Sequence, residues 1–256
     1  MKKKEVYDIE FYKSQVEDSY KASRKVLEMF KQYYQPKSVI DVGCGVGTWL
    51  KTWQALGVDK IYGLDCNTID DNLLYVSREH IGIVDLEKHE NLANETYELV
   101  MSIEVAEHLN PNASEAFVKL LTSYGDVVLF SAAIPKQPGN NHINCQPPKY
   151  WVELFNKQGY ECFDFLRKKN MELGIGWSPT QNMFLYVKRD KLSLFESQGF
   201  IVDNDPMFFY CPKWVDFLLD QNKTQADQYF ILSYLGKTMK KLKKSLRRMF
   251  FDINVS

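Results

Sequence analysis

Apolar stretches of two kinds alternate along most of this 256-residue chain. Short runs rich in Val, Ile, Leu and Phe predict buried strands, and stretches with apolar residues three or four positions apart predict amphipathic helices. The predicted strands are residues 38–42, 60–64, 81–84, 97–103, 126–132, 161–166 and 181–188. The predicted helices are residues 14–34, 48–56, 112–124 and 149–158. Because strands that alternate with helices form a doubly wound sheet, we expect an α/β, Rossmann-like fold with a mostly parallel sheet.

Acidic residues stand at the carboxyl ends of four predicted strands or just beyond them. They are Asp41, Asp65, Asp85 and Glu104. Parallel strands end at one edge of a sheet, and ligands of open α/β sheets bind beyond that edge. The sequence therefore predicts a ligand site there.

A glycine-rich turn follows the first predicted strand. Residues 39–50 read VIDVGCGVGTWL, which places Gly43, Gly45 and Gly47 between the strand and a predicted helix. Glycine allows a ligand to approach the backbone closely, and a helix N-terminus offers unpaired N–H groups. A glycine triplet also occurs in dinucleotide sites. Here, however, the spacing Asp-x-Gly-x-Gly-x-Gly, with two later acidic strand ends, resembles the class I S-adenosylmethionine (SAM) methyltransferases.

This resemblance implies a SAM site. The glycine turn would take the methionine end of SAM, Asp65 would accept hydrogen bonds from the ribose hydroxyls, and Asp85 would accept one from the adenine amino group. The full set of expected cofactor residues is Asp41, Gly43, Gly45, Gly47, Asp65, Asp85, Leu86 and Ser102. The alternative for Asp65 and Asp85 is that they only cap turns or helices.

A second motif follows the predicted strand 97–103. Residues 102–109 read SIEVAEHL, so Glu104, Glu107 and His108 would share one side of a helical turn. Two carboxylates and an imidazole suit a divalent cation such as Mg²⁺ or Mn²⁺. The alternative is that Glu107 and His108 cap the helix that begins near Pro111.

The Glu-x-x-Glu-His pattern is similar to that of metal-dependent O-methyltransferases, among them small-RNA 3′-end ribose methyltransferases and ubiquinone-pathway catechol O-methyltransferases. In those families a later histidine completes the site, and the resemblance implies that His142 does so here, with Asn144 assisting as a supporting residue or substrate ligand. We expect the metal ligands Glu104, Glu107, His108 and His142 and the catalytic residues Glu104, His108 and His142. Alternatively, His108 or His142 acts as a general base without a metal, or His142 is only a solvated loop residue.

Further segments, residues 130–135, 142–151 and 181–187, resemble a family of microbial and viral methyltransferases that commonly accompany glycan-building enzymes. The resemblance implies a SAM-dependent O-methyltransferase that acts on a sugar hydroxyl of a glycan or glycan precursor, with Trp151, Trp177 and aromatic residues of 207–214 stacking on the sugar or packing in the core. Two departures leave the acceptor open. Cys145 stands where that family usually has an acidic residue, and residues 176–180 replace its Trp-Trp-Tyr-Arg run.

Other functions remain as alternatives: a small-molecule (quinone- or catechol-type) O-methyltransferase, an RNA ribose methyltransferase, and a non-catalytic SAM-binding subunit. The formal net charge of −1 argues against a nucleic-acid partner. The intact carboxylates and histidines argue against a subunit without catalytic activity.

The chain changes character after Lys188. We expect a methyltransferase domain over residues 1–189 and a C-terminal extension over 190–256. Residues 237–248 hold seven basic residues and no acidic one, and Met239, Leu242 and Leu246 recur at helical spacing. This pattern predicts a basic amphipathic helix, about residues 237–251, that lies on a membrane surface or a partner. The alternative is an ordinary solvated helix docked on the domain.

The expected location is cytoplasmic, with peripheral membrane contact. The first residues lack the apolar stretch of a signal peptide, and no apolar run reaches the roughly 18–20 residues of a membrane span. The five cysteines are scattered and odd in number, which favours reduced thiols.

Overall fold

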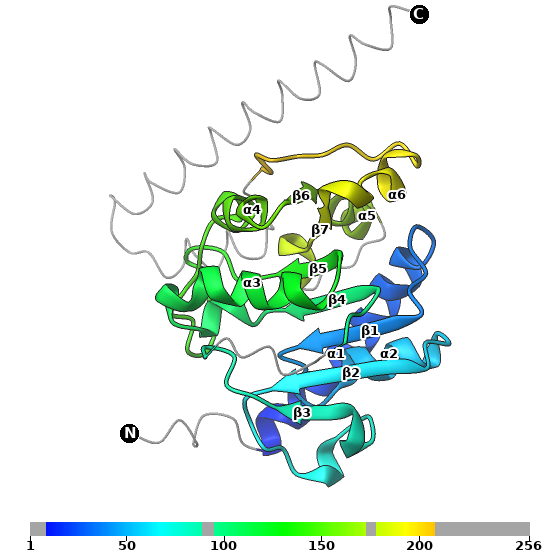
Figure 1. The fold of residues 1–256 in the computed structure, drawn as a ribbon. Helices are drawn as coiled ribbons and strands as arrows, with labels where there is room; N and C mark the ends of the chain where they lie inside the picture. The colour runs from blue at the N-terminus through cyan, green and yellow to red at the C-terminus, as the bar shows by residue number, and fades with distance from the viewer. Residues whose placement is uncertain (1–8, 89–94, 173–177, 208–256) are drawn as a thin grey trace, which may run out of the picture. The chain divides into compact units, whose positions relative to one another are not determined.

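The computed structural model describes residues 9–88, 95–172 and 178–207 of the chain (Figure 1). The chain divides into two compact units, Met1–Asn204 and Asp205–Ser256, and the fold below is that of the first. The basic segment 237–251 lies outside the described residues, so its membrane contact stays a prediction. The predicted domain boundary after residue 189 also stays a prediction.

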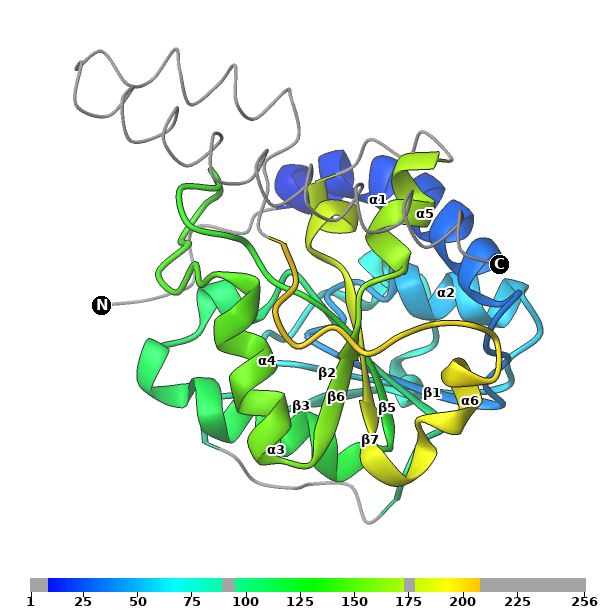
Figure 2. The same ribbon diagram turned by 90° about the horizontal axis from the view of Figure 1, so that it is seen from above.

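A seven-stranded sheet forms the centre of the first unit, in the order β3-β2-β1-β4-β5-β7-β6 (Figures 1 and 2). Its neighbours pair in parallel from β3 through β5, while β7 runs antiparallel to both β5 and β6. The strands are β1 (Ser38–Val42), β2 (Lys60–Asp65), β3 (Ile81–Ile83), β4 (Leu99–Ile103), β5 (Val127–Ser131), β6 (Tyr160–Phe163) and β7 (Phe184–Lys188). The predicted mostly parallel, doubly wound sheet is thus confirmed.

Helices cover both faces of the sheet (Figure 2). On one face α3 (Ser114–Tyr124) and α4 (Pro148–Lys157) bury residues such as Phe117 and Phe155 against the strands. On the other face the buried residues come from the remaining helices, for example Trp53. These helices are α1 (Ile9–Phe30), α2 (Thr48–Ala55), α5 (Leu166–Glu172) and α6 (Ser193–Glu196). Since β1 and β5 are buried along their whole length, their sequences are unbroken apolar runs except at Asp41 and their serines.

Several sequence-based boundaries differ from the structure. The predicted helix 14–34 spans Ile9–Phe30, and the predicted strand 181–188 begins only at Phe184 because Ser178–Asn182 form a 3-10 helix. The predicted strand 161–166 ends at Phe163, and Leu166 instead begins α5 with its side chain fully buried. The predicted strand 97–103 begins only at Leu99. An apolar run does not by itself distinguish a buried strand from the start of a buried helix.

Strand direction decides which residues meet. The carboxyl ends of β1, β2, β4 and β5 lie at one edge of the sheet because these strands are parallel. The antiparallel β7 begins at that edge, so the residues just before Phe184 lie beside the residues just after Ser131. Among the described helices, none combines the length and apolar character needed to cross a membrane.

Candidate functional site

The glycine turn between β1 and α2 is held tightly against its neighbours. The backbone N–H groups of Gly43 and Cys44 both donate to the Leu64 carbonyl, at 2.7 and 3.0 Å. Gly43 has φ 87°, and a Cβ on it would lie 2.3 Å from a methyl group of Val105. Gly45 has φ 53°, but a Cβ there would meet no atom within 4 Å. The turn therefore packs against the segment after β4 and leaves open space beside Gly45.

Asp65 connects the end of β2 to this turn. One carboxylate oxygen accepts the Gly45 N–H at 2.8 Å and the other accepts the Asn67 N–H at 2.9 Å. The side chain is buried, and burial raises the pKa of this carboxyl, although the backbone hydrogen bonds oppose the shift. Two parts of the predicted cofactor site, the glycine turn and Asp65, are thus brought together.

The other predicted cofactor residues lie in different environments. Asp41 is buried in β1, where burial and, secondly, the charge of Asp65 raise its pKa to about 7. Ser102 is fully buried in β4, and its hydroxyl has no hydrogen-bond partner. Asp85 is half-exposed, accepts the Glu87 N–H at 3.1 Å and pairs with Lys88. These are the contacts of the turn-capping alternative, and the roles of Asp85 and of the buried Leu86 toward adenine stay predictions.

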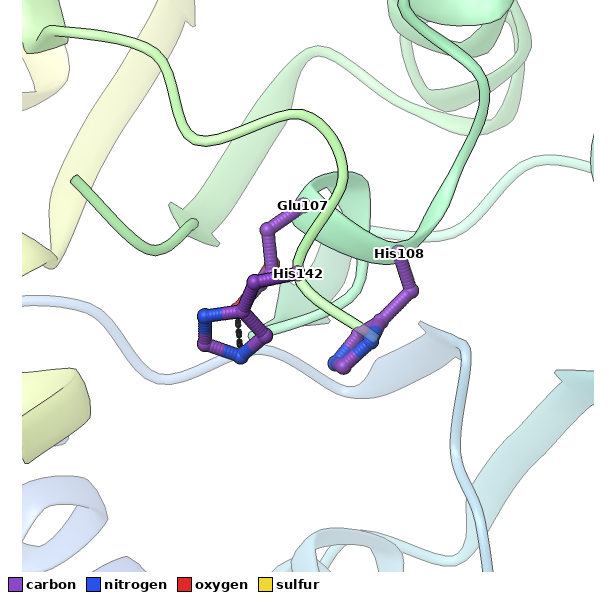
Figure 3. Close-up of side chains that lie close together, drawn as sticks. All are labelled: Glu107, His108 and His142. Carbon is purple, nitrogen blue, oxygen red and sulfur yellow. Dashed lines mark ion pairs between the residues drawn. The ribbon is translucent and has the colours of Figure 1, made fainter. Parts of the chain in front are cut away.

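The acid–histidine motif occupies the same edge, directly after β4. Glu104 has the positive φ of 56°, and the next residues form the short 3-10 helix η4 (Ala106–His108). The loop after β5 brings His142 beside this helix (Figure 3). Glu107 is fully buried, whereas both histidines are partly exposed. The predicted pairing of the motif with a distant histidine is therefore present in the structure.

Glu107, His108 and His142 form a compact group, and we call it, together with Glu104, the acid–histidine cluster. One potential ligand atom from each of the three lies within 4.8 Å of the others. His142 Nε2 is 4.0 Å from Glu107 Oε1, and the two imidazole rings are 5.0 Å apart between centroids. Glu104 is not part of this three-residue group, but its charge acts on Glu107.

Several polar atoms of the cluster are buried without a hydrogen-bond partner. They are Glu104 Oε1, both carboxylate oxygens of Glu107 and His108 Nδ1. Burial raises the pKa of Glu104 to about 7, and burial together with the charge of Glu104 raises the pKa of Glu107 well above its usual range. Buried polar groups normally find a partner, so the donor set fits a divalent cation, which would satisfy these oxygens and keep both carboxylates ionised.

The histidines are in the form that a metal needs. Burial and then the neighbouring His142 lower the pKa of His108 to about 4, and burial lowers the pKa of His142. Both rings are therefore neutral near neutral pH and carry a free lone pair. His142 Nδ1 lies 3.2 Å from the Gln137 carbonyl oxygen. Because that oxygen only accepts, Nδ1 carries the proton and the lone pair is on Nε2, which faces Glu107.

The two residues that follow His142 join its loop to η4 through hydrogen bonds. The N–H groups of Ile143 and Asn144 both donate to the Glu107 carbonyl at 2.9 Å. The buried Asn144 amide donates to the Ala106 carbonyl and the Ser114 hydroxyl at 3.1 and 2.9 Å. Of the two roles predicted for Asn144, the structure therefore favours support of the loop over a direct contact with substrate.

Sequence reasoning missed the residues that support the cluster from the loop side. Gln137 and Asn182 are both buried, and their side chains are joined by a hydrogen bond of 2.7 Å. Nothing in a polar loop sequence distinguishes such a glutamine from a solvated one. The structure assigns Trp151 to the core, since it is 2% exposed and packs on Phe130 with ring centroids 5.2 Å apart. Trp177 and residues 208–214 lie outside the described residues.

Comparison with known families and structures adds to this geometry. A family model described as "Methyltransferase domain" matches residues 12–164. CalS10 from Micromonospora echinaspora, an amino pentose methyltransferase with SAM bound, is 12% identical, with a TM-score of 0.52 over 72% of this chain and 99% of that chain. DesVI from Streptomyces venezuelae is 13% identical, with a TM-score of 0.51 over 71% of this chain and 100% of that chain.

An O-methyltransferase family protein from Burkholderia thailandensis is 13% identical, with a TM-score of 0.52 over 70% of this chain. The chain spans 58% of the length of that protein. Comparison with curated proteins gives no match. At these identities the structural likeness shows the fold alone, because one fold supports many activities.

Proposed function

We propose that this chain, which belongs to the methyltransferase-domain family, is a SAM-dependent methyltransferase that methylates a sugar hydroxyl of a glycan or glycan precursor with the help of a divalent cation. The observation that carries the proposal is the group of Glu107, His108 and His142, with buried carboxylate oxygens that have no hydrogen-bond partner. This group follows β4 and β5, at the same edge of the sheet as the glycine turn.

In this proposal different residues at this edge of the sheet bind the cofactor and the cation. The open space beside Gly45 and the buried carboxylate of Asp65 hold the cofactor. Glu107, His108 and His142 would hold the cation, with Glu104 beside them. A bound divalent cation lowers the pKa of an acceptor hydroxyl and orients its oxygen. The Gln137 carbonyl keeps the His142 lone pair on Nε2, on the side of Glu107.

A sugar acceptor is favoured by chemistry and by the family resemblance. Two adjacent hydroxyls of a sugar can chelate one cation, which would place a single oxygen for methyl transfer. The sequence segments around Glu104 and His142 resemble methyltransferases that accompany glycan-building enzymes. A catechol offers the same pair of oxygens, so a small-molecule acceptor is the alternative within this mechanism.

A second mechanism has its own supporting observation. His142 is neutral, its Nδ1–H is held by a backbone carbonyl, and its Nε2 is 4.0 Å from Glu107 Oε1. An imidazole fixed in this way is suited to act as a general base without a metal. Under this alternative, His142 alone would take the proton of the acceptor hydroxyl.

The experiment compares methyl transfer with and without a cation. Protein freed of metal with EDTA is assayed for formation of S-adenosylhomocysteine from SAM, with methyl glycosides and catechol as acceptors, before and after addition of Mg²⁺ or Mn²⁺. We expect activity to vanish in EDTA, to return with either cation, and to require a glycoside. His108→Ala and Glu107→Gln should stay inactive after metal is added.

His80→Ala is the matched control, because His80 precedes β3 at the opposite edge of the sheet and lies outside the cluster. It should behave like the unchanged protein. Full activity in excess EDTA, lost only on replacing His142, would decide for the general base. Activity on catechol without activity on any glycoside would decide for the small-molecule acceptor.

A further inference from the structure

Gln137 contacts two members of the acid–histidine cluster, one through its side chain and one through its backbone. It is 5% exposed, and its amide nitrogen donates to Glu104 Oε2 at 3.0 Å. The backbone carbonyl of the same residue accepts the His142 Nδ1–H at 3.2 Å. One residue thus contacts a carboxylate that follows β4 and an imidazole of the loop after β5.

The side-chain amide of Gln137 cannot easily flip. Its oxygen accepts the Ile134 N–H at 3.2 Å and the Asn182 side-chain amide at 2.7 Å. The Gln137 N–H in turn donates to the Ile134 carbonyl at 2.9 Å, which closes a tight turn. With its oxygen held by two donors, the amide must present its N–H side to Glu104.

We propose that Gln137 is the positioning residue of the acid–histidine cluster, holding His142 with its carbonyl in the group that would take the cation and holding Glu104 with its amide beside Glu107. The inference rests on the proposed metal-dependent function and names a residue through which that site is built. Groups that orient metal ligands in this way typically change metal affinity about 10- to 100-fold when they are replaced. Gln137 itself leaves no amide atom without a partner, so it acts through its neighbours.

Two variants test the amide group of Gln137 and the length of its side chain one at a time. Gln137→Met keeps a side chain of similar length and removes both hydrogen-bonding atoms, and Gln137→Asn keeps the amide but is too short to reach Glu104 and Asn182 together. Both are compared as full-length, metal-free proteins. The first readout is Mn²⁺ affinity by titration calorimetry, in which we expect a loss of about 10- to 100-fold for either variant.

The second readout needs no metal. The ¹⁵N chemical shifts of the His142 ring report which nitrogen carries the proton. The unchanged protein should show Nδ1 protonated and Nε2 bare. Gln137→Met keeps the backbone carbonyl but loses the side-chain hydrogen bonds to Ile134 and Asn182 that fix its position, so the carbonyl should shift and a mixture of the two tautomers should appear. If the unchanged protein binds no Mn²⁺, the metal-dependent function fails, while the tautomer shift still decides the role of Gln137.

Thr52→Val is the matched control for a general loss of stability. Thr52 is buried and shares a hydrogen bond of 2.7 Å with Ser23, between α1 and α2. It should lower the unfolding midpoint and leave both Mn²⁺ affinity and the His142 tautomer unchanged. The proposal is overturned if both Gln137 variants keep the unchanged affinity and tautomer, or if Thr52→Val alters these readouts as much as they do.

Discussion

At the scale of single residues, the place of His142 depends on the absence of a side chain at Gly139. A Cβ at Gly139 would lie 2.1 Å from Cε1 and Nε2 of the His142 ring. Nonbonded Cβ atoms do not approach other atoms so closely, so with a larger residue either the imidazole or the loop backbone must shift. A glycine in the loop 134–148 therefore leaves the space that the His142 ring occupies.

Gly139→Ala should move the His142 ring and weaken Mn²⁺ binding by about 10- to 100-fold, as other losses of ligand orientation do. Titration calorimetry of the metal-free protein measures this. Gly57→Ala is the control, because its Cβ meets nothing within 4 Å although its φ of 88° costs strain. It should destabilise the fold without changing Mn²⁺ affinity, and equal affinities for the two variants would refute the argument.

Asp41 is a single residue that makes the free energy of unfolding depend on pH. Burial and then the charge of Asp65 raise its pKa to about 7 in the fold, against about 4 in the unfolded chain. The folded chain therefore binds the Asp41 proton more tightly than the unfolded chain does. The stabilisation from this bound proton is present below about pH 4 and is lost as the pH rises to about 7. The difference amounts to at most about 4 kcal/mol.

Asp41→Asn should remove this dependence, because the side chain no longer ionises. Urea unfolding of the protein without ligand, at about pH 5 and about pH 8, should show the variant gaining stability relative to the unchanged chain as the pH rises. A constant difference between the two proteins at both pH values would show that the fold does not raise the pKa of Asp41.

At the scale of elements, the acidic residues that follow β2 and β3 have different surroundings. Asp65 holds the glycine turn after β1 through Gly45 and holds its own loop through Asn67. Asp85 is half-exposed and bonds within its own turn. The sequence treats the two alike, as strand-end acids, whereas the structure shows Asp65 buried and joining two elements and Asp85 half-exposed.

Asp65→Ala should therefore weaken SAM binding by about 10- to 100-fold, since it removes an acceptor and frees the turn. Asp85→Ala should cost less than about 10-fold because water can replace its contacts. Calorimetric titration with SAM measures both, with the exposed Asp59→Ala as control. A larger loss for Asp85→Ala would show that the adenine contact outweighs the fastening of the turn.

At the scale of the whole molecule, both ligands are expected to stabilise the fold by binding to it alone. A ligand at a hundredfold excess over its Kd adds about 2.7 kcal/mol, or roughly 5–10 °C in the unfolding midpoint of a domain of this size. The chain should show this rise with SAM, and separately with Mn²⁺.

The rise with Mn²⁺ should disappear in His108→Ala and persist in His80→Ala, while the rise with SAM should persist in both variants. Thermal unfolding followed by circular dichroism measures the four combinations. A rise with Mn²⁺ that survives His108→Ala would place the bound cation outside the acid–histidine cluster.

The sequence by itself determined the α/β fold, most strand positions and the residues of two motifs. Apolar runs and glycine turns are patterns of neighbouring residues, and an apolar run marks a segment that is buried in the fold. β1 is accordingly found at Ser38–Val42, where it was predicted. The glycine turn is likewise where the spacing from Asp41 to Gly47 predicted it. The pattern was wrong at Leu166, whose burial suits a helix as well as a strand, and at Gln181 and Asn182, which belong to a 3-10 helix before β7.

Only the tertiary structure decided how the motifs meet. It brought His142 to Glu107 through hydrogen bonds from the loop to η4, and it gave Gln137 its two contacts with the cluster. It also turned Asn144 inward, buried Trp151 and distinguished Asp65 from Asp85. These outcomes depend on strand order and on the packing of loops from distant parts of the chain, and a pattern of neighbouring residues does not encode those contacts one by one.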